Sequence, residues 1–523
     1  ILRLPFTDVI FKDSLSVHRK DLVAMVDGFT DKKITFAEMH DASHRFAKAL
    51  RDRYNIKKGD CISIISPNDL HYFTAFIGIA LTGAFSTCIN PQYSESEILF
   101  QLQSTNAKLI VCHPLCLERV AKLVKDSSLP PGFRVILMDT NEVSTTVKDL
   151  LPKSSAFLSE FIDTTIPVDV SSFAEQVGSD FDSKSTLLTV PFSSGTTGKS
   201  KGVMLSHRNL TANIHQILTV EGEHLQASET NPRGRLLMPL PFFHIYGLTA
   251  GLLVPFVSGA QVVFMPAFDL QRCLSLCQQH RITRAYLVPP IITALAKHPM
   301  VDEYDLSSLK VIMSGAAPLG ADVQVACGQR LNCFVKQAWG MTELSPAATV
   351  TPDSYISPTS SSESLLAALQ ELEGSSGPLL IDTQAKIVGV ETGEDLSCEQ
   401  EGELLIRGPQ VMLGYLNNPQ ATAETLRPDG WMHTGDIARF DSRGWLHITD
   451  RKKELIKYKG FQVAPAELEA LLLSMRQVKE AIVIPVKDEI AGEVPRAYVV
   501  KQANCPADFK EEDVLEFIHA KVA

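Results

Sequence analysis

The chain has 523 residues, 45% of them hydrophobic, and its formal net charge is −11. This length exceeds one ordinary domain, and the acidic balance argues against a general nucleic-acid-binding protein. The ten cysteines are scattered without a C-x-x-C pair, which favours core packing in a reducing compartment over a zinc site.

Helices and strands alternate along most of the chain. A short strand followed by an amphipathic helix is predicted over residues 34–54, and a helix over residues 71–83. Apolar runs that predict strands lie at residues 60–68, 108–112, 234–244, 261–265, 284–290 and 309–315. This alternation predicts an α/β fold with largely parallel sheets, in which ligands bind where the strands end.

No membrane-spanning or secretory segment is predicted. The apolar stretch 248–265 is interrupted by Pro255, Gly259 and Gln261, so it does not have the pattern of a membrane helix. No signal peptide is visible, and the chain begins at Ile1 rather than Met. We expect native residues to be missing at this end, where a targeting signal could lie, and a cytoplasmic or peroxisomal location.

The last third of the chain has a different pattern. Residues 352–377 are polar at both ends with a helical centre, which predicts an exposed insertion or mobile loop. Short strands follow and predict a small β-barrel or sandwich. After a charged connector at 450–460, a new α/β pattern begins and stops in mid-helix at Ala523.

The stretch "PFSSGTTGKSKGVMLSH" at 191–207 resembles a phosphate-binding loop. A P-loop requires Gly at the position of Ser193, so a P-loop NTPase is disfavoured. Two glycines let the backbone approach a ligand, and the hydroxyls and lysines suit a triphosphate. The residues concerned are Ser193, Ser194, Gly195, Thr196, Thr197, Gly198, Lys199 and Lys201. The alternative is a solvated Ser/Gly turn.

Eight motifs in a fixed order resemble those of the adenylate-forming enzymes, most closely the 4-coumarate–CoA ligases and their acyl-CoA ligase relatives. They are "SSGTTGKSKG" (193–202), "PFFHIYGL" (241–248), "SGAAPLG" (314–320), "QAWGMTE" (337–343), "GYLNNP" (414–419), "WMHTGD" (431–436), "DRKKELIKYKGFQVAPAELE" (450–469) and "GEVPRAYVV" (492–500). The resemblance implies a large N-terminal domain at 1–449 that binds ATP and the acid, a hinge at 450–453 and a mobile, incomplete α+β C-terminal domain at 454–523.

The resemblance also implies a reaction. A carboxylate attacks the α-phosphate of ATP to give an acyl-adenylate, and the thiol of coenzyme A then displaces AMP. Lys201 and the loop before it would hold the β- and γ-phosphates, Thr342 the α-phosphate, and Glu343 would bind Mg²⁺, a hard cation that suits a carboxylate. Asp436 and Arg451 would contact the ribose.

The remaining implied site residues surround the base, the acid and the thiol. Trp339 would stack on adenine, with core packing as the alternative for so large a side chain. The implied nucleotide contacts are Gly315, Ala316, Ala317, Gln337, Ala338, Trp339, Gly340 and Met341. His244, Tyr246 and Met313 would lie along the acid. Lys453 would be the hinge, Lys457 and Gln462 would act with the acyl-adenylate, and Lys459 and Gly460 would lie near coenzyme A.

Departures from the family pattern bear on the substrate. Met313 and Ala267 stand where coumarate ligases have lysines, and Ala338 replaces a pocket Gly, so the resemblance implies a less polar pocket and a hydrophobic fatty or aryl acid. The C-terminal motif that carries the family's adenylation lysine is absent, which we expect to reflect missing native residues. A luciferase-like oxygenase and a non-catalytic nucleotide-binding protein are the alternatives.

Overall fold

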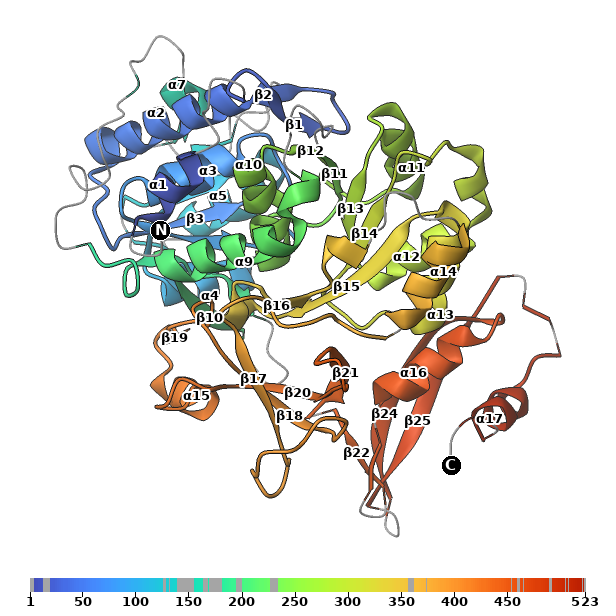
Figure 1. Ribbon diagram of the computed structural model, residues 1–523. Helices are drawn as coiled ribbons and strands as arrows, with labels where there is room; N and C mark the ends of the chain where they lie inside the picture. The colour runs from blue at the N-terminus through green and yellow to red at the C-terminus, as the bar shows by residue number, and fades with distance from the viewer. Residues whose placement is uncertain are drawn as a thin grey trace.

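The computed structural model contains four β-sheets with helices packed around them (Figure 1). It describes residues 4–12, 19–125, 128–130, 132–138, 155–162, 168, 181–193, 200–225, 234–355, 362–372, 374–452, 454–458, 461–463, 465–488, 492–503, 505–506, 508–519 and 521.

The first sheet has the strand order β16-β15-β14-β13-β11-β12-β1-β2 and is parallel except at its two outermost pairs. Its strands are β1 (Val23–Asp27), β2 (Lys33–Thr35), β11 (Arg235–Met238), β12 (Gln261–Phe264), β13 (Arg284–Leu287), β14 (Val311–Ser314), β15 (Phe334–Gly340) and β16 (Ala347–Val350). The strands predicted from the apolar runs at 261–265, 284–290 and 309–315 are confirmed as β12, β13 and β14.

The second sheet has the order β19-β10-β8-β4-β3-β5-β6-β7, with β9 paired to β10. Its strands are β3 (Cys61–Ile65), β4 (Phe85–Ile89), β5 (Ala107–Cys112), β6 (Arg134–Leu137), β7 (Ala156–Phe157), β8 (Leu187–Thr189), β9 (Phe192–Ser193), β10 (Lys201–Ser206) and β19 (Gly414–Tyr415). Strands β3 and β4 are buried along their whole length, as expected of inner strands in a parallel sheet.

Helices cover these two sheets (Figure 1). They are α1 (Phe6–Phe11), α2 (Phe36–Tyr54), α3 (Tyr72–Ala80), α4 (Glu95–Ser104), α5 (Leu117–Lys125), α7 (Ser159–Ile162), α9 (His207–Leu225), α10 (Val254–Ser258), α11 (Leu270–Gln279), α12 (Pro289–Lys297), α13 (Ala321–Leu331) and α14 (Ser362–Glu371). Thr35 begins α2 in a capping box with Glu38, and Ser94 begins α4 in one with Glu97.

The third sheet, β17-β18-β20-β21, is antiparallel. Its strands are β17 (Gln384–Val388), β18 (Gly402–Arg407), β20 (Met432–Phe440) and β21 (Leu446–Arg451), with α15 (Pro419–Thr425) before β20. The sequence predicted a small β-barrel or sandwich here. The four strands form one sheet that encloses a small core with Trp339 and Ala348 of the first sheet. Residues 376–379 pair with the start of β21 and with Thr349 of β16, which joins this sheet to the first one.

The segment 352–377 was predicted as an exposed insertion or mobile loop, and the structure describes its residues 352–355, 362–372 and 374–377, which are partly buried. It contains a short 3₁₀ turn, η5 (Asp353–Tyr355), and then α14. Leu369 and Leu372 are buried in the main hydrophobic core, and Asp353 is only 1% exposed. The polar composition of the segment did not indicate burial of Asp353, because this side chain is buried through ion pairs rather than through apolar packing.

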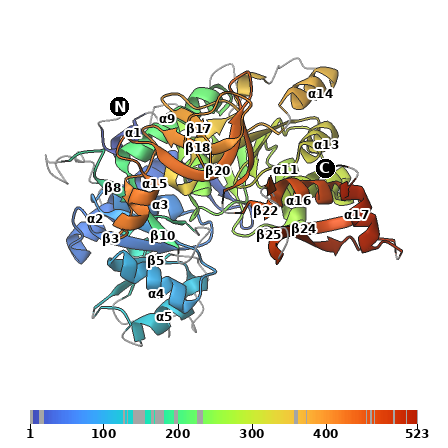
Figure 2. The same ribbon diagram turned by 90° about the horizontal axis from the view of Figure 1, so that it is seen from below.

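The fourth sheet belongs to the C-terminal part of the chain and has the order β23-β22-β25-β24. Its elements are β22 (Ile456–Tyr458), β23 (Phe461–Val463), α16 (Pro465–Ser474), β24 (Val478–Asp488), β25 (Gly492–Lys501) and α17 (Glu511–His519). In both views this part projects from the rest of the molecule, with β22 and α16 closer to it than α17 (Figures 1 and 2).

The helices in the described ranges all lack the combination of length and hydropathy that crossing a bilayer requires. The apolar stretch 248–265 instead forms the end of a π-helical turn, η2 (Gly247–Leu253), followed by α10 and β12.

Candidate active site

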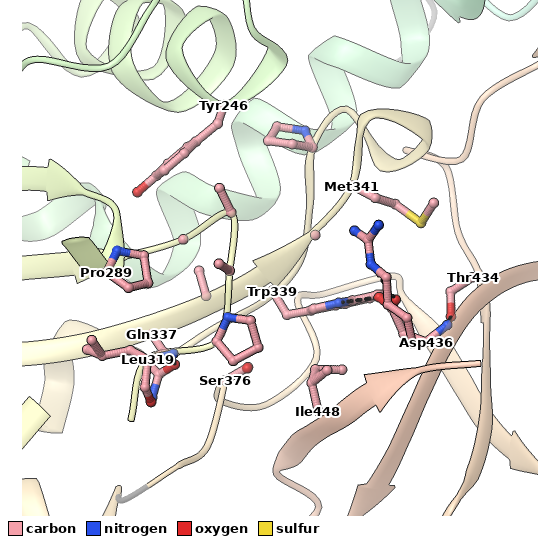
Figure 3. A pocket seen from close by; sticks show the side chains of 18 of the residues that line it. Tyr246, Pro289, Leu319, Gln337, Trp339, Met341, Ser376, Thr434, Asp436 and Ile448 are labelled. Atoms are coloured by element: carbon pink, nitrogen blue, oxygen red, sulfur yellow. Dashed lines mark hydrogen bonds and ion pairs between the residues drawn. The ribbon is translucent and has the colours of Figure 1, made fainter. Parts of the chain in front are cut away.

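One cavity of about 1790 Å³ opens where the first three sheets meet the C-terminal part. It is lined by the ends of β9, β10, β14 and β15, by β20 and β21, and by α16. Figure 3 shows the pocket, with Tyr246 on one side and Thr434, Asp436 and Ile448 on the other. Parallel strands that end together at a crevice are the usual place for a ligand in such sheets.

The two ends of the loop that resembles a phosphate-binding loop are held at the cavity wall. Ser193 ends β9 and Lys201 begins β10, and the two residues are direct cross-strand partners. Both line the cavity. The loop residues Ser194, Gly195, Thr196, Thr197 and Gly198 lie outside the described residues.

Glu343 lies beside these strands in the 3₁₀ turn η4 (Thr342–Leu344) and is 5% exposed. Its Oε1 accepts hydrogen bonds from Ser193 Oγ at 3.2 Å and from Tyr415 Oη at 2.8 Å. Lys201 Nζ lies 4.8 Å from the centre of the Tyr415 ring. Thr342 also lines the cavity, so these groups gather at one end of it.

Burial and the adjacent Glu343 carboxylate raise the pKa of Tyr415, so its hydroxyl remains a proton donor at neutral pH. No group of three or more potential metal-ligating side chains exists among the described residues. A magnesium ion held by Glu343 would therefore need further oxygen ligands from phosphate and water, which is how Mg²⁺ is commonly bound.

The turn that presents Thr342 and Glu343 needs a glycine. A Cβ on Gly340 would lie 2.1 Å from the carbonyl oxygen of Pro346. The next residue, Met341, donates its N–H to that same carbonyl at 2.9 Å. Gly340 and Met341 line the cavity, so their part of the motif shapes the backbone at its wall.

The segment after β14 forms a second cavity wall. Ala316 adopts a left-handed conformation with φ 72°, and Ala316 and Ala317 are exposed to the cavity. Gln337 holds this segment, because its Oε1 accepts the Leu319 N–H at 3.2 Å and its Nε2 donates to the Leu319 carbonyl at 3.3 Å. The Gln337 amide thus supports the wall.

Trp339 and Asp436 are joined across the cavity (Figure 3). The indole Nε1 donates to Asp436 Oδ2 at 2.9 Å, while Arg451 Nε lies 3.6 Å from Asp436 Oδ1. Asp436 and Arg451 are cross-strand partners in β20 and β21. Trp339 also belongs to the hydrophobic cluster of the third sheet, so it packs in a core while it lines the cavity, and its stacking on adenine stays a prediction.

Burial raises the pKa of the Asp436 carboxyl to about 6, against the opposing effects of Arg451 and the Trp339 hydrogen bond. Arg451 is more than half exposed and reaches Asp436 from the solvent side. The carboxylate therefore titrates close to neutral pH, at the cavity surface where a ligand would meet it.

His244, Tyr246 and Met313 line the part of the cavity where the sequence predicts the acid, which we call the acid end. The Tyr246 hydroxyl donates to the carbonyl of Met313 at 3.4 Å. Its ring faces Gly315 so closely that a Cβ there would lie 3.0 Å from Tyr246 Cε1. Met313 is 2% exposed and Ala338 lines the cavity on the next strand, so this end is mainly apolar.

His244 is open to the cavity although protein surrounds it. Limited hydration lowers the pKa of its imidazole, so the ring is neutral at pH 7. Its Nδ1 accepts the Tyr246 N–H at 3.3 Å, which assigns the ring proton to Nε2. The ring can therefore donate a hydrogen bond to a ligand from Nε2.

The predicted residues of the C-terminal part are only partly described. Lys457 and Gln462 are backbone partners across β22 and β23, and their side chains lie outside the described residues. Lys453, Lys459 and Gly460 also lie outside them.

The side chain that the sequence reasoning missed is Tyr415. Its motif "GYLNNP" was noted without a role, although the tyrosine in it was a signal.

Comparison with known proteins was made on sequence and on structure. The family model described as AMP-binding enzyme matches residues 11–416, and that described as AMP-binding enzyme C-terminal domain matches residues 467–523. The chain is 36% identical to "4-coumarate-CoA ligase 1" of Narcissus pseudonarcissus, over 100% of this chain and 90% of the relative. It is 38% identical to "4-coumarate--CoA ligase 3" of Arabidopsis thaliana, over 99% and 86%.

Among solved structures, the crystal structure of ATP-bound MatB from Rhodopseudomonas palustris is similar with a TM-score of 0.81 and 25% sequence identity. The match covers 100% of this chain and 93% of that one. The arrangement of the sheets around the cavity is therefore shared with a protein whose structure was solved with ATP bound.

Proposed function

The chain belongs to the family of AMP-binding enzymes, and we propose that it is an ATP-dependent carboxylic acid–CoA ligase whose acid is hydrophobic. It acts through an acyl-adenylate, with ATP and coenzyme A as co-substrates. The relatives described above are named as CoA ligases, so neither the luciferase-like nor the non-catalytic alternative is favoured.

The observation that carries this function is the continuity of the cavity. Ser193, Lys201 and Glu343 line the same cavity as His244 and Met313. A reaction between a triphosphate and an apolar acid needs one continuous space, so that the reacting atoms meet in line.

In the first half-reaction an oxygen of the acid's carboxylate attacks the α-phosphorus of ATP, and pyrophosphate leaves with the electrons of the broken P–O bond. Lys201 neutralises charge on the phosphates, and Thr342 donates a hydrogen bond to the α-phosphate. A magnesium ion at Glu343 would supply further charge neutralisation. The Nε2–H of His244 donates to the acid carboxylate and fixes its orientation.

The nucleoside is held by two walls of the cavity. Asp436 accepts hydrogen bonds from the ribose hydroxyls, with Arg451 beside it. Trp339 and the segment Gly315–Ala317 flank the adenine. Support for this placement comes from the exposed backbone at Ala316 and Ala317 and from the cavity position of Asp436.

In the second half-reaction the sulfur of coenzyme A attacks the acyl carbon and AMP leaves, while the thiol proton passes to solvent. We assign Lys453 as the hinge, Lys457 and Gln462 to the acyl-adenylate, and Lys459 and Gly460 to the coenzyme A side. Part of α16, including Glu469 and Leu473, lines the cavity, which supports a contribution of the C-terminal part to the site.

The hydrophobic nature of the acid follows from the side chains at the acid end. A phenol hydroxyl against Met313 would lose its water partners without gaining a side-chain hydrogen-bond partner there, at a cost of about 1–3 kcal/mol. An alkyl group has no such cost and gains about 0.8 kcal/mol per buried methylene. Alkyl acids or unsubstituted aryl acids are therefore better substrates than 4-coumarate.

A screen of carboxylic acids for pyrophosphate release, each with and without coenzyme A, tests this function. We expect release of pyrophosphate with alkyl and aryl acids, and faster formation of AMP when coenzyme A is present. Formation of ADP and phosphate, or the absence of pyrophosphate with every acid, would contradict the proposal.

A further inference from the structure

Four charged side chains are fully buried behind the acid end of the cavity, and no step above uses them. They are Glu221, Arg284, Lys336 and Asp353, each with a side chain no more than 3% exposed. We call them the buried charge cluster. Two are basic and two acidic, so the cluster is neutral when all four are ionised.

Every member of the cluster contacts both members of opposite charge. Lys336 Nζ lies 2.8 Å from Glu221 Oε1 and 2.7 Å from Asp353 Oδ1. Arg284 pairs with Asp353 through both terminal guanidinium nitrogens, and its Nη1 lies 3.5 Å from Glu221 Oε1. Lys336 also donates to the carbonyl of Thr351 at 2.9 Å. Such a set is costly to separate, because each released ion would remain buried without a partner.

The sheet register places this cluster directly behind the cavity wall. Met313 on β14 is the parallel partner of Lys336 on β15, so their side chains lie on the same face of the sheet. Ala338, two residues further along β15, lies on that face too and lines the cavity together with Met313. Lys336 thus continues the row of residues that forms the acid end.

Two other elements give the same placement independently. On α9, Ile217 lines the cavity and Glu221 follows one helical turn later on the same face. After β16, Val350 lines the cavity and the chain continues to Asp353 in η5. The strand β15, the helix α9 and the segment from β16 to η5 therefore each carry a residue that lines the cavity and, close to it in the chain, a charged residue of the cluster.

A tyrosine pair connects the cluster to the wall. The hydroxyl of Tyr286 donates to Glu221, and its ring is stacked on that of Tyr246 with the ring centres 6.3 Å apart. Tyr286 is itself the partner of Met313 on the neighbouring strand. Behind Met313, a flexible side chain that could give way to a substrate, there is therefore a layer fixed by ion pairs and by Tyr286.

We propose that the buried charge cluster is the fixed floor of the acid pocket and limits the length of the acid. Aryl acids and short or medium alkyl acids end at Met313, whereas long-chain fatty acids are excluded. An alkyl chain that passed Met313 would have to separate buried ion pairs and leave their charges against hydrocarbon. This specificity role rests on the proposed function of the same cavity.

The test measures kcat/KM for pyrophosphate release with hexanoate, octanoate, dodecanoate, palmitate and cinnamate. For the wild-type protein we expect palmitate to be at least tenfold poorer than octanoate. Replacing a single member would leave an unpaired buried charge and could unfold the protein, so the variant is the double substitution Glu221→Ala/Lys336→Ala. It removes one charge of each sign and keeps the pair Arg284–Asp353.

In this double variant we expect the palmitate-to-octanoate ratio to rise at least tenfold. The matched control is Lys386→Ala/Asp395→Ala, which removes an ion pair of 2.8 Å between Lys386 on β17 and Asp395 in the segment after it; neither residue lines the cavity. The control should keep the wild-type length profile.

Three results would contradict the proposal that the buried charge cluster limits the length of the acid. The first is a wild-type protein that uses palmitate as well as octanoate, which decides the matter even where the double variant does not fold. The second is a folded double variant, checked by circular dichroism, with the wild-type length profile. The third is the absence of pyrophosphate with every acid, which alone would overturn the proposed function as well.

Discussion

Both carboxylate oxygens of Asp436 have a partner within the protein. Trp339 donates to one oxygen at 2.9 Å and Arg451 lies 3.6 Å from the other. A tyrosine at position 339 would not carry this indole N–H. Trp339 is therefore placed to orient the carboxylate, in addition to the contact with adenine that we propose for it.

The first prediction concerns the pH dependence of nucleoside binding. Burial raises the pKa of Asp436 to about 6, so the carboxyl is ionised above that pH and protonated below it. In the proposed site the ionised form accepts both ribose hydroxyls, so affinity should be lost as the pH falls through about 6. Calorimetry with adenosine, which has no titrating phosphate, should show roughly tenfold weaker binding at pH 5 than at pH 7.

Two variants complete this measurement. Asp436→Asn should bind adenosine weakly and without the pH dependence. Trp339→Phe removes a hydrogen bond to the ionised form and should shift the midpoint to higher pH. A wild-type affinity that is flat between pH 5 and pH 7 would exclude Asp436 as the titrating contact.

The second prediction concerns Lys201. Lys201→Ala should raise the KM for ATP roughly tenfold to a hundredfold, since a hydrogen bond to a charged group is worth about 1.5–3 kcal/mol. The KM for the acid should change much less, because the proposed contact of Lys201 is to the phosphates and not to the acid. Steady-state kinetics with Lys386→Ala as the control would measure this; an unchanged KM for ATP with unchanged kcat would remove Lys201 from the site.

Glu343 provides the third prediction. Glu343→Gln should increase the magnesium concentration needed for half-maximal rate and slow formation of the acyl-adenylate. Thioester formation from preformed acyl-adenylate should be nearly unaffected, because that step has no triphosphate to neutralise. Rapid-quench measurement of each half-reaction separates the two, and an equal loss in both would contradict the metal role.

At the scale of elements, the neighbouring strands β14 and β15 set the chemistry of the acid end. Met313 and Lys336 are partners on one face of these strands. A lysine at position 313, which the resemblance described above gives to the coumarate ligases, would lie beside Lys336. The two positive charges would then repel each other. The positive charge of Lys336 therefore favours an apolar residue at position 313 on the neighbouring strand.

The fourth prediction uses this pairing. Met313→Gln introduces a neutral donor and should raise kcat/KM for 4-coumarate relative to cinnamate by about tenfold, the value of one satisfied hydrogen bond in a buried site. Met313→Leu, which is apolar and similar in size, is the control and should leave the ratio unchanged. Equal ratios in the wild type and in Met313→Gln would show that the acid's ring does not end at this residue.

The sequence predicted elements well where one local pattern determines them. The apolar runs at β12, β13 and β14 and the capped helix α2 are examples. It failed where the decisive contact is distant in the chain. Asp353 looked exposed because its partner Arg284 is 69 residues away in the chain.

The same distinction applies to the candidate site. Motifs located Lys201, Glu343 and Asp436, and the structure brings all three to one cavity. The roles of Tyr415 and the buried charge cluster could not be predicted, because each depends on side chains from several elements. Tyr415 on β19, for example, reaches Glu343, which lies 72 residues earlier in the chain.

For the whole molecule, the cavity lies between the first three sheets and a C-terminal part that projects from them (Figures 1 and 2). Residues of α16 line the cavity together with residues of β20 and β21. A movement of the C-terminal part about residues 450–453 would change which of its residues face the acyl carbon. Both half-reactions could then use the same cavity.

The most direct test of the central claim is a two-step single-turnover measurement on the full-length protein. The protein is mixed with ATP labelled at the α-phosphate and with octanoate, quenched, and analysed; coenzyme A is added to a parallel sample before quenching. The account predicts labelled acyl-adenylate and pyrophosphate in the first sample, and AMP with octanoyl-CoA in the second. Labelled ADP, or AMP without any thioester after coenzyme A is added, would contradict it.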